Sequence, residues 1–498
     1  MQKTNEKKFV LILILLHLVI ALPLALTLNI WVDEASTLHT TQNGFFQAFQ
    51  NLFTDEKQAP VYFLLMSFWR KINDSIFFAR LFSVICSALA IIVFSPLARQ
   101  IWDEKTAVVI TAIFALHPYL FWASLEIRLY SFIILITCLL FLFFHKGYLR
   151  EDSADRKSQY LYVLTSITAL YTNYYLGFLL VGGFIALLVT RRLKEAKSYF
   201  WQMLVVGIAI SPLFWIISFQ FSYRVVTFQT EKTLIEGIKI LWNHFLTFVL
   251  PTEIFTTEES TVFSIVRSWI VRLSVLAVIG IFIKNKFTIL DRNIAAFGTI
   301  SAVCGVFFLF VYYLLGTDYV EIRHAAIFFA AIFIFVSATL VKILPKKFRL
   351  PCAVLYAIFF SYSVVSIYPN LTKRGDWQRV AEFIEQNEKP NQSIVIFPVY
   401  DAISLPYYYR GINKVQPDEK FFSFFAEAES GSPNNFSNQI RFLIGKIPPE
   451  AAEVWLATSE KCAVKQSCEP LENFVQANYT VIEEKSFYKE KVRLLRKK

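Results

Sequence analysis

The feature that most constrains this chain is a series of mostly apolar runs, most of them close to the roughly 20 residues that a helix needs to cross a bilayer. With 56% hydrophobic and 17% charged residues among 498, the chain is too apolar for an ordinary soluble protein. The sequence therefore predicts a mainly α-helical, polytopic membrane protein of about 11 transmembrane helices. The expected spans are 9–30, 76–97, 106–122, 129–145, 159–172, 174–190, 200–219, 263–283, 294–315, 324–341 and 350–369.

The basic residues between these runs predict the orientation of the chain. Lys and Arg gather in alternate loops, and the positive-inside rule makes those loops cytoplasmic. The N-terminus is then cytoplasmic, and the residues after Pro369 lie outside the cell membrane. This topology also explains the formal charge of +11 without a nucleic-acid partner. The loop residues are Lys3, Lys7 and Lys8; Arg99 and Lys105; Lys146, Arg150, Arg156 and Lys157; Arg191, Arg192, Lys194 and Lys197; Lys284, Lys286 and Arg292; and Lys342, Lys346, Lys347 and Arg349.

Acidic and basic residues mark the mouths of helices on the expected external side. Asp33 and Glu34 follow the first span in "WVDEAST", and similar clusters stand in "SLEIRLY" (124–130) and "GTDYVEIRH" (316–324). Charges at a membrane boundary cost a few kcal/mol each and usually face a water-filled cavity. Each one alone could be an interfacial anchor. Because all three clusters lie on one side, we interpret them as parts of a site.

Two further external loops are expected. The first loop, about 31–75, contains "QAPVYFLLMSFWRKI", whose apolar part is too short to span and is flanked by Lys57, Arg70 and Lys71. This pattern favours an amphipathic helix on the outer membrane surface; a buried re-entrant helix is the alternative. The second is a long loop from about 220 to 262.

The stretch from "WVDEAST" through "QAPVYFLLMSFWRKI" to "SLEIRLYSF" resembles the N-terminal part of the GT-C glycosyltransferases, in the branch of protein O-mannosyltransferases and lipid A aminoarabinose transferases. The resemblance covers residues 9–150 and touches "EIRHAAIFFA" near residue 324. It implies a membrane enzyme that moves a sugar from a polyprenyl phosphate carrier to an acceptor on the external face. By the same resemblance Asp33 matches the general base, Glu34 its neighbour at the acceptor site, and Glu126 and Arg128 an acid and a base of an external loop.

Other positions match or depart from the family pattern. Arg80 matches an Arg that opens the second span, and Tyr130 completes a Glu-x-Arg-hydrophobic-Tyr element. Gln58 and Ala59 stand where many relatives have His-Pro, and His324 stands where Tyr is usual. These departures concern the residues that would hold a metal or the carrier phosphate.

The chemistry of such a transfer fits these residue types. A carboxylate can remove the acceptor proton as the bond to the sugar forms. Fixed cations can stabilise charge on the leaving phosphate, and Lys57, Arg128 and Arg323 are the candidates, with His39 and His324 as further ones. A divalent cation held by Asp33 and Glu34 or Glu126 would serve too, but the sequence shows no metal-binding motif and we predict no metal ligand.

After Pro369 the chain becomes mixed polar and predicts a small external α/β domain over residues 370–498. Residues 375–389 form an amphipathic helix pattern, "SIVIFPVY" a buried strand, "EVWLATS" a second strand, and "YTVIEEKSFYKEKVRLL" a closing strand pair. No Gly-rich phosphate loop is present, so a nucleotide-sugar site is not expected. Cys462 and Cys468 lie in this domain, where an oxidising compartment would permit a disulfide.

Two other classes of protein remain open. A lipid or sugar transporter would also have many spans, and transporters tend to show internal repeats and broken helices near the midplane. The sequence shows no repeat, and its charges gather at one face. A non-catalytic scaffold would not require Asp33, Glu34, Glu126 and Arg128 together. The sugar and the acceptor, whether lipid, glycan or protein, stay open, and a bacterial inner (plasma) membrane is the expected location.

Overall fold

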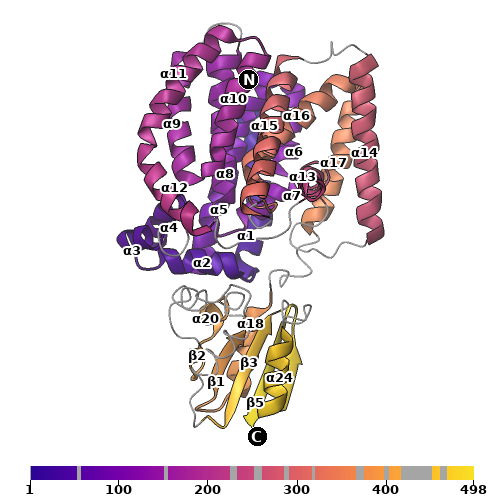
Figure 1. The fold of residues 1–498 in the computed structure, drawn as a ribbon. Coiled ribbons are helices and arrows are strands. Elements are labelled where there is room, and N and C mark those ends of the chain that lie inside the picture. The colour runs from indigo at the N-terminus through magenta and orange to yellow at the C-terminus, as the bar shows by residue number, and fades with distance from the viewer. Residues whose placement is uncertain are drawn as a thin grey trace. The chain divides into compact units, whose positions relative to one another are not determined.

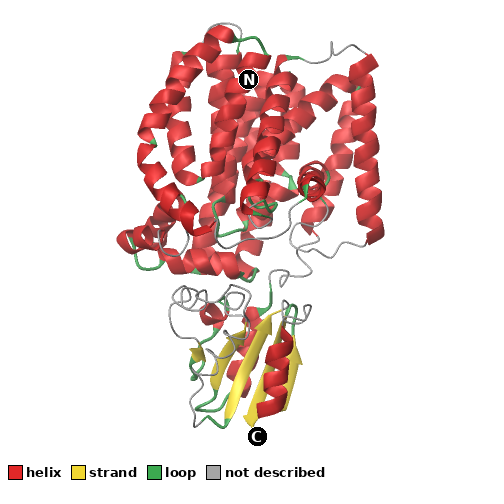
Figure 2. Cartoon of the chain, viewed as in Figure 1, coloured by secondary structure: helices red, strands yellow, loops and turns green. Residues whose placement is uncertain are grey.

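The chain separates into two compact units in the computed structural model. Unit 1 comprises Met1–Leu26, Thr41–Phe53 and Lys57–Pro369, and unit 2 comprises Thr27–Thr40, Thr54–Glu56 and Asn370–Lys498. The first is helical and the second contains a sheet (Figures 1 and 2). The structure describes residues 2–52, 58–150, 155–224, 233–251, 261–284, 291–316, 320–365, 375–397, 403–416, 451–459 and 468–498.

Up to residue 365, almost all of the residues that the structure describes are helical. They are α1 (Gln2–Thr27), α2 (Val32–Thr41), α3 (Phe45–Asn51), α4 (Val61–Arg70), α5 (Ile76–Ile101), α6 (Glu104–Ala115), α7 (Pro118–Ser124), α8 (Tyr130–Phe144), α9 (Arg156–Thr172), α10 (Gly177–Val189), α11 (Leu193–Ala209), α12 (Ser211–Arg224), α13 (Leu234–Val249), α14 (Thr261–Lys284), α15 (Arg292–Leu315), α16 (Ala326–Ile343) and α17 (Lys346–Val365). Helix α2 belongs mainly to unit 2.

The predicted mainly α-helical membrane fold is confirmed, whereas a count of 11 spans is not. Within the described residues, six helices are long and apolar enough to cross a membrane, or up to eight if each of two bent helix pairs is one span. The six are Lys7–Thr27, Ile76–Ile101, Tyr130–Leu149, Arg292–Leu315, Ala326–Ile343 and Lys346–Val365. Of the other expected spans, 106–122 and 200–219 are the two bent pairs, 159–172 lies in the 17-residue α9, 174–190 is the shorter apolar helix Tyr174–Val189, and 263–283 lies in the 24-residue α14.

Two expected straight spans are bent. The span predicted over 106–122 breaks between α6 and α7 with a bend of 50°, and that over 200–219 breaks between α11 and α12 with a bend of 57°. Pro118 begins α7, and Pro212 lies in the first turn of α12. Proline has no N–H to donate and disfavours helical backbone in the residue before it, so each helix ends just ahead of its proline. The His117 side chain then accepts from the Tyr119 N–H and caps the start of α7.

Helix α13 lies within the segment that was expected to be a long external loop, 220–262. Its sixteen residues lie in that range, and His244 and Phe248 on it are buried. It is seen along its axis in Figure 1, across the direction of its neighbours in unit 1. One apolar face is enough for a helix that packs against others.

Helix α4 confirms that the apolar part of the segment expected to be the first external loop forms an amphipathic helix. Tyr62, Phe63 and Met66 are buried on one face, and Phe68 is 66% exposed on the other. Helix α3 packs beside it and exposes Phe46. Apolar residues on the outer face are typical of a helix in contact with lipid.

The loops that the positive-inside rule places on one side converge in the structure. His145 Nδ1 lies 3.1 Å from Gln100 Oε1, Arg192 Nε donates to Tyr148 O at 3.2 Å, and Arg292 Nη1 donates to Leu149 O at 3.4 Å. Four loops far apart in the sequence therefore meet at one end of unit 1. The side of the membrane on which that end lies remains an expectation from charge.

Unit 2 contains a five-stranded sheet in the order β2-β1-β3-β5-β4. Its strands are β1 (Ser393–Phe397), β2 (Val415–Gln416), β3 (Glu453–Ser459), β4 (Tyr479–Ser486) and β5 (Glu490–Lys497), and its helices are α18 (Trp377–Asn387), α20 (Leu405–Tyr408) and α24 (Glu469–Asn478). Strand β1 pairs in parallel with β2 and β3, and β5 pairs antiparallel with β3 and β4. The predicted helix, strands and closing strand pair are all present, and β2, α20 and α24 are additions.

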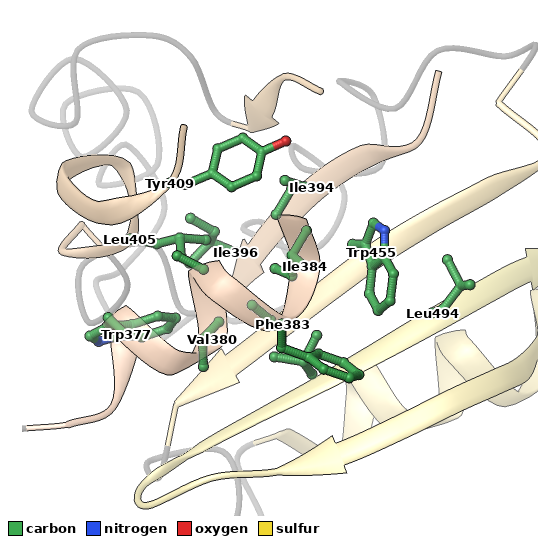
Figure 3. Packing of buried hydrophobic residues seen from close by; sticks show 13 residues of the cluster. Trp377, Val380, Phe383, Ile384, Ile394, Ile396, Leu405, Tyr409, Trp455 and Leu494 are labelled. Atoms are coloured by element: carbon green, nitrogen blue, oxygen red, sulfur yellow. The ribbon is translucent and has the colours of Figure 1, made fainter. Parts of the chain in front are cut away.

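Both faces of the sheet are covered, because alternate residues of a strand point to opposite sides. On one face, Ile394 and Ile396 pack with Trp455 and with the α18 residues Trp377, Val380, Phe383 and Ile384, together with Leu405 and Tyr409 (Figure 3). On the other face, Val395 and Phe397 pack against Leu471 and Val475 of α24. A strand buried on both sides explains why "SIVIF" is an unbroken apolar run.

The structure describes five of the six cysteines. Cys86, Cys138, Cys304 and Cys352 are free thiols in helices of unit 1. Cys468 is disulfide-bonded. Cys462 lies outside the described residues, so its pairing with Cys468 stays a prediction.

Candidate active site

Arg80 lies fully buried in the first turns of α5. Its Nη1 donates to the carbonyl oxygen of Ala25 at 2.9 Å, close to the end of α1. The last carbonyls of a helix have no partner within the helix, and a guanidinium is a strong donor for them. Arg80 therefore stabilises the end of α1, the helix that leads into the acid pair. A contact of Arg80 with substrate remains a prediction.

Glu126 and Arg128 lie between α7 and α8, Tyr130 is the first residue of α8, and all three are buried. Ser83 Oγ of α5 donates to the Glu126 carbonyl oxygen at 2.6 Å, which fixes the backbone of this segment. The Arg128 guanidinium lies 5.9 Å from the centre of the Phe63 ring of α4, a cation–π distance. Tyr130 stacks on Trp122 with ring centres 5.0 Å apart. The Glu-x-Arg-hydrophobic-Tyr element is thus held rigidly by α4, α5 and α7.

Arg323 and His324 lie in a short turn before α16. Arg323 Nε is 2.7 Å from Glu321 Oε2, and the His324 ring lies 6.2 Å from that of Tyr175. Two hydrogen bonds hold this turn: Tyr119 OH donates to Ile322 O at 2.9 Å, and the His244 ring bonds to Val320 O.

Tyr119 joins two of the predicted clusters. It lies on α7, directly before the Glu126–Tyr130 segment, and its hydroxyl bonds to the turn that carries Arg323 and His324. Its ring is also 5.1 Å from that of Trp122, on which Tyr130 stacks. Unit 1 therefore connects the second and third predicted clusters through one buried tyrosine.

The acid pair lies in unit 2, in the first turn of α2. Glu34 is fully buried, and Asp33 is partly exposed. Acidic side chains in the first turn interact favourably with the positive end of the helix dipole. Thr37 Oγ1 donates to Asp33 O at 3.2 Å, and Ala35 N donates to Trp31 O at 2.9 Å. His39 lies in the last turn of the same helix.

Helix α2 is bonded to the C-terminal part of unit 2 through two adjacent tyrosines of α20. The Ile30 N–H donates to Tyr408 OH at 2.7 Å, and Tyr407 OH donates to Ala35 O at 3.2 Å. These two contacts lie on either side of Asp33 and Glu34. The position of the acid pair is therefore coupled to residues near 408.

Lys57, a predicted phosphate contact, lies outside the described residues. Across the described part of the chain, no three His, Cys, Asp or Glu side chains group as a metal site would need.

Several residues that build the site were not predicted. His117, Tyr119 and His244 are polar groups within apolar segments, and each bonds to a backbone carbonyl far away in the sequence. A polar residue in an apolar run is a signal that a sequence offers, but its partner is not.

Comparison with known proteins identifies the relatives of this chain. Residues 57–216 match the model of the dolichyl-phosphate-mannose-protein mannosyltransferase family. The crystal structure of ArnT from Cupriavidus metallidurans bound to undecaprenyl phosphate matches with a TM-score of 0.56 at 15% identity, over 98% of each chain. The same protein in the apo state matches with a TM-score of 0.52 at 13% identity, again over 98% of each chain. The comparison with curated protein sequences gives no match.

Proposed function

We propose that this chain is a GT-C superfamily membrane glycosyltransferase that transfers a sugar from a polyprenyl phosphate to an acceptor on the external face. The family match over residues 57–216 and the fold shared with ArnT support this proposal. The observation that carries the proposal is the likeness to ArnT over nearly the whole chain, because that relative is bound to undecaprenyl phosphate. The donor, the side of the membrane and the residue roles are parts of the proposal.

Asp33 acts as general base in this reaction. The acceptor oxygen bonds to C1 of the sugar, its proton passes to the Asp33 carboxylate, and the bond from C1 to the phosphate oxygen breaks with its electron pair on the leaving polyprenyl phosphate. Glu34 shapes the acceptor side. Both carboxylates come from one helix turn, which supports a shared role.

Arg128, Arg323, His324 and Lys57 bind the phosphate. Charge that develops on the leaving phosphate needs fixed cations in a site with little water. The Tyr119 link between the Arg128 segment and the Arg323 turn supports their joint action, since both belong to one rigid part of unit 1. Glu126 and Tyr130 contact the sugar, and a divalent cation is not required by this scheme.

A transporter is the rival function. The two bent helix pairs resemble the broken helices of transporters, so that feature no longer argues against one. The family match to a mannosyltransferase favours transfer.

The test measures release of polyprenyl phosphate. Purified full-length protein in proteoliposomes is given a radiolabelled pool of polyprenyl phosphate hexoses or pentoses, with cell-envelope extract as the source of acceptor. We expect the Asp33→Asn variant to lose at least about 100-fold in rate while it remains folded, since general base catalysis contributes about 10²–10⁴. The acceptor class is then identified by whether the radiolabel appears in the lipid, the glycan or the protein fraction.

A matched control carries Glu382→Gln, an exposed acid of α18, and should transfer at the wild-type rate. If the folded wild type releases no polyprenyl phosphate from any pool but moves the intact lipid across the bilayer, transfer is wrong and a transporter is right.

A further inference from the structure

A groove of about 630 Å³ runs between α6, α16 and α17 of unit 1. Its walls are aliphatic and aromatic along most of their length, with residues such as Val109 and Ile113 of α6 and Val336 and Leu340 of α16. None of the residues that the proposed transfer uses lines it. The groove is therefore a feature that the proposed active site leaves unexplained.

One end of the groove is basic. Lys105, Lys346 and Arg349 line it there, together with a single acid, Asp103. That acid is already engaged, since its two carboxylate oxygens accept from the Thr106 N–H at 3.2 Å and the Thr106 hydroxyl at 2.7 Å. Arg349 is held in place because its Nε donates to Leu344 O at 3.2 Å. The charges at this end favour an anionic ligand.

The opposite end of the groove is aromatic. Phe333 and Phe360 line it, and their rings lie 6.0 and 4.7 Å from the ring of His117. His117 in turn bonds to Phe248 O at 3.0 Å, and Phe248 also lines the groove. An apolar chain can lie against these rings, but an anionic group cannot be stabilised there.

The length of the groove fits one leaflet of a bilayer. The α16 residues that line it run from Ile332 to Val341, with Leu344 just beyond the helix, and this stretch rises by about 18 Å at 1.5 Å per residue. Half of a hydrocarbon core of about 30 Å is close to that length. A membrane phospholipid has the same design, a charged headgroup above acyl chains of one-leaflet length.

We propose that this groove binds an anionic glycerophospholipid, whose phosphate lies between Lys105, Lys346 and Arg349 and one of whose acyl chains lies along α6 and α16. Charge complementarity selects the headgroup, and the apolar walls hold the chain. A polyprenyl phosphate is a different occupant, because the proposed transfer needs its phosphate near Arg128 and Arg323, whereas the cations of the groove lie in the first turns of α6 and α17.

The experiment measures lipid binding to the delipidated full-length protein in detergent. Phosphatidylglycerol, phosphatidylcholine and undecaprenyl phosphate are added separately, and bound lipid is counted by native mass spectrometry alongside the shift in thermal unfolding. We expect phosphatidylglycerol to bind and stabilise more than phosphatidylcholine. The double variant Lys346→Gln/Arg349→Gln should weaken phosphatidylglycerol binding by about tenfold or more, as expected from the loss of two basic residues near an anionic lipid.

Two further variants distinguish binding in the groove from adsorption of lipid to surface charge. Lys194→Gln/Lys197→Gln removes the same charge from exposed positions of α11 outside the groove and should bind phosphatidylglycerol like the wild type. Val336→Trp fills the groove and leaves its cations in place; it should lose phosphatidylglycerol binding while its unfolding temperature without lipid stays that of the wild type.

Three outcomes would overturn the proposal. The first is equal binding of phosphatidylglycerol and phosphatidylcholine. The second is undiminished binding by a folded Val336→Trp variant, which would mean that lipid adsorbs only to surface charge. The third is undecaprenyl phosphate displacing phosphatidylglycerol with the same sensitivity to both groove variants, which would assign the groove to the donor. All three outcomes are measured without an assay of sugar transfer.

Discussion

The Tyr408 hydroxyl accepts a hydrogen bond of 2.7 Å from the backbone N–H of Ile30, three residues before Asp33. Tyr407 adds a second bond to the carbonyl of Ala35, after the acid pair. The C-terminal part of the chain therefore holds both sides of the helix turn that carries the proposed base. This contact predicts that α20 positions the acid pair.

Replacing Tyr408 with Phe removes the acceptor for the Ile30 N–H and leaves the ring in place. We expect kcat for sugar transfer to fall about tenfold with KM for the donor unchanged, because a small misplacement of a catalytic group costs up to about 100-fold in rate. Steady-state kinetics of the purified variant measures both constants.

Tyr488→Phe is the matched control, since Tyr488 lies in the turn between β4 and β5 of the same unit. It should leave kcat unchanged. A Tyr408→Phe enzyme with wild-type kcat at saturating donor would show that α20 does not position the acids.

Tyr119→Phe tests the link between the two clusters of unit 1. It removes the 2.9 Å bond to Ile322 O, which keeps only the 3.2 Å bond from the Ala325 N–H, and the loss of such a hydrogen bond costs about 0.5–1.5 kcal/mol. We expect lower thermal stability and a severalfold higher KM for the polyprenyl phosphate sugar, because the turn that carries Arg323 loses its support.

Tyr171→Phe provides the comparison. Its hydroxyl makes the same kind of bond, 3.1 Å to Ala209 O, but between α9 and the end of α11. This variant should lose stability without a change in KM. If both variants raise KM equally, the effect is a general loss of packing and the assignment to the Arg323 turn is wrong.

Local patterns explain what the sequence predicted correctly. The apolar stripe of Trp377, Val380, Ala381, Phe383 and Ile384 predicted α18, and all five side chains are buried. The run "SIVIFPVY" predicted a buried strand, and β1 within it is buried along its whole length. In α18 the spacing of the apolar residues reports which face is buried, and in β1 their unbroken run reports burial of the whole strand.

The structural features that the sequence did not predict depend mainly on contacts between residues far apart in the chain. Ile30 and Tyr408 are 378 residues apart, and no periodicity reports such a pair. Helix α13 has polar residues on one face and was expected to be part of a loop, because its stability comes from packing that only the fold supplies. The bend at Pro118 is a different case. The sequence contains the proline, but the apolar run on both sides of it was interpreted as one span.

The contacts of Glu453 make the stability of unit 2 depend on pH. Hydrogen bonds from Arg496, at 3.0 and 2.8 Å, and from Gln392, at 2.6 Å, lower the pKa of the Glu453 carboxyl. A carboxyl with a lowered pKa stabilises the fold above its ordinary pKa of about 4.3, and this stabilisation is lost as the pH falls through the lower, folded-state value. Glu453→Gln should therefore destabilise β3 and β5 at neutral pH, by up to about 1 kcal/mol because Arg496 is largely exposed, and should do so less below about pH 4.

Hydrogen exchange of the β3 and β5 amides at pH 7 and at low pH measures this difference. Glu483→Gln on β4 is the control, since no ion pair or side-chain hydrogen bond of its carboxylate is seen among the described residues, and it should show no such pH dependence. A Glu453→Gln effect that is the same at both pH values would contradict the role of this carboxylate.

Gly375, just before α18, has a φ of +116°, and a Cβ atom at this position would lie 2.7 Å from Glu490 Oε1. The Glu490 carboxylate also accepts from the Asp376 N–H at 2.7 Å, so it cannot move away without losing that bond. Gly375→Ala should therefore destabilise unit 2 by about 1–3 kcal/mol, through backbone strain and this contact.

Gly207→Ala is the matched control, because nothing lies within 4 Å of a Cβ there and α11 is helical at that position, so no loss is expected. Limited proteolysis of the full-length variants, followed by mass analysis of the C-terminal fragments, compares the two. Equal resistance of unit 2 in both variants would show that the backbone at Gly375 adapts to a side chain.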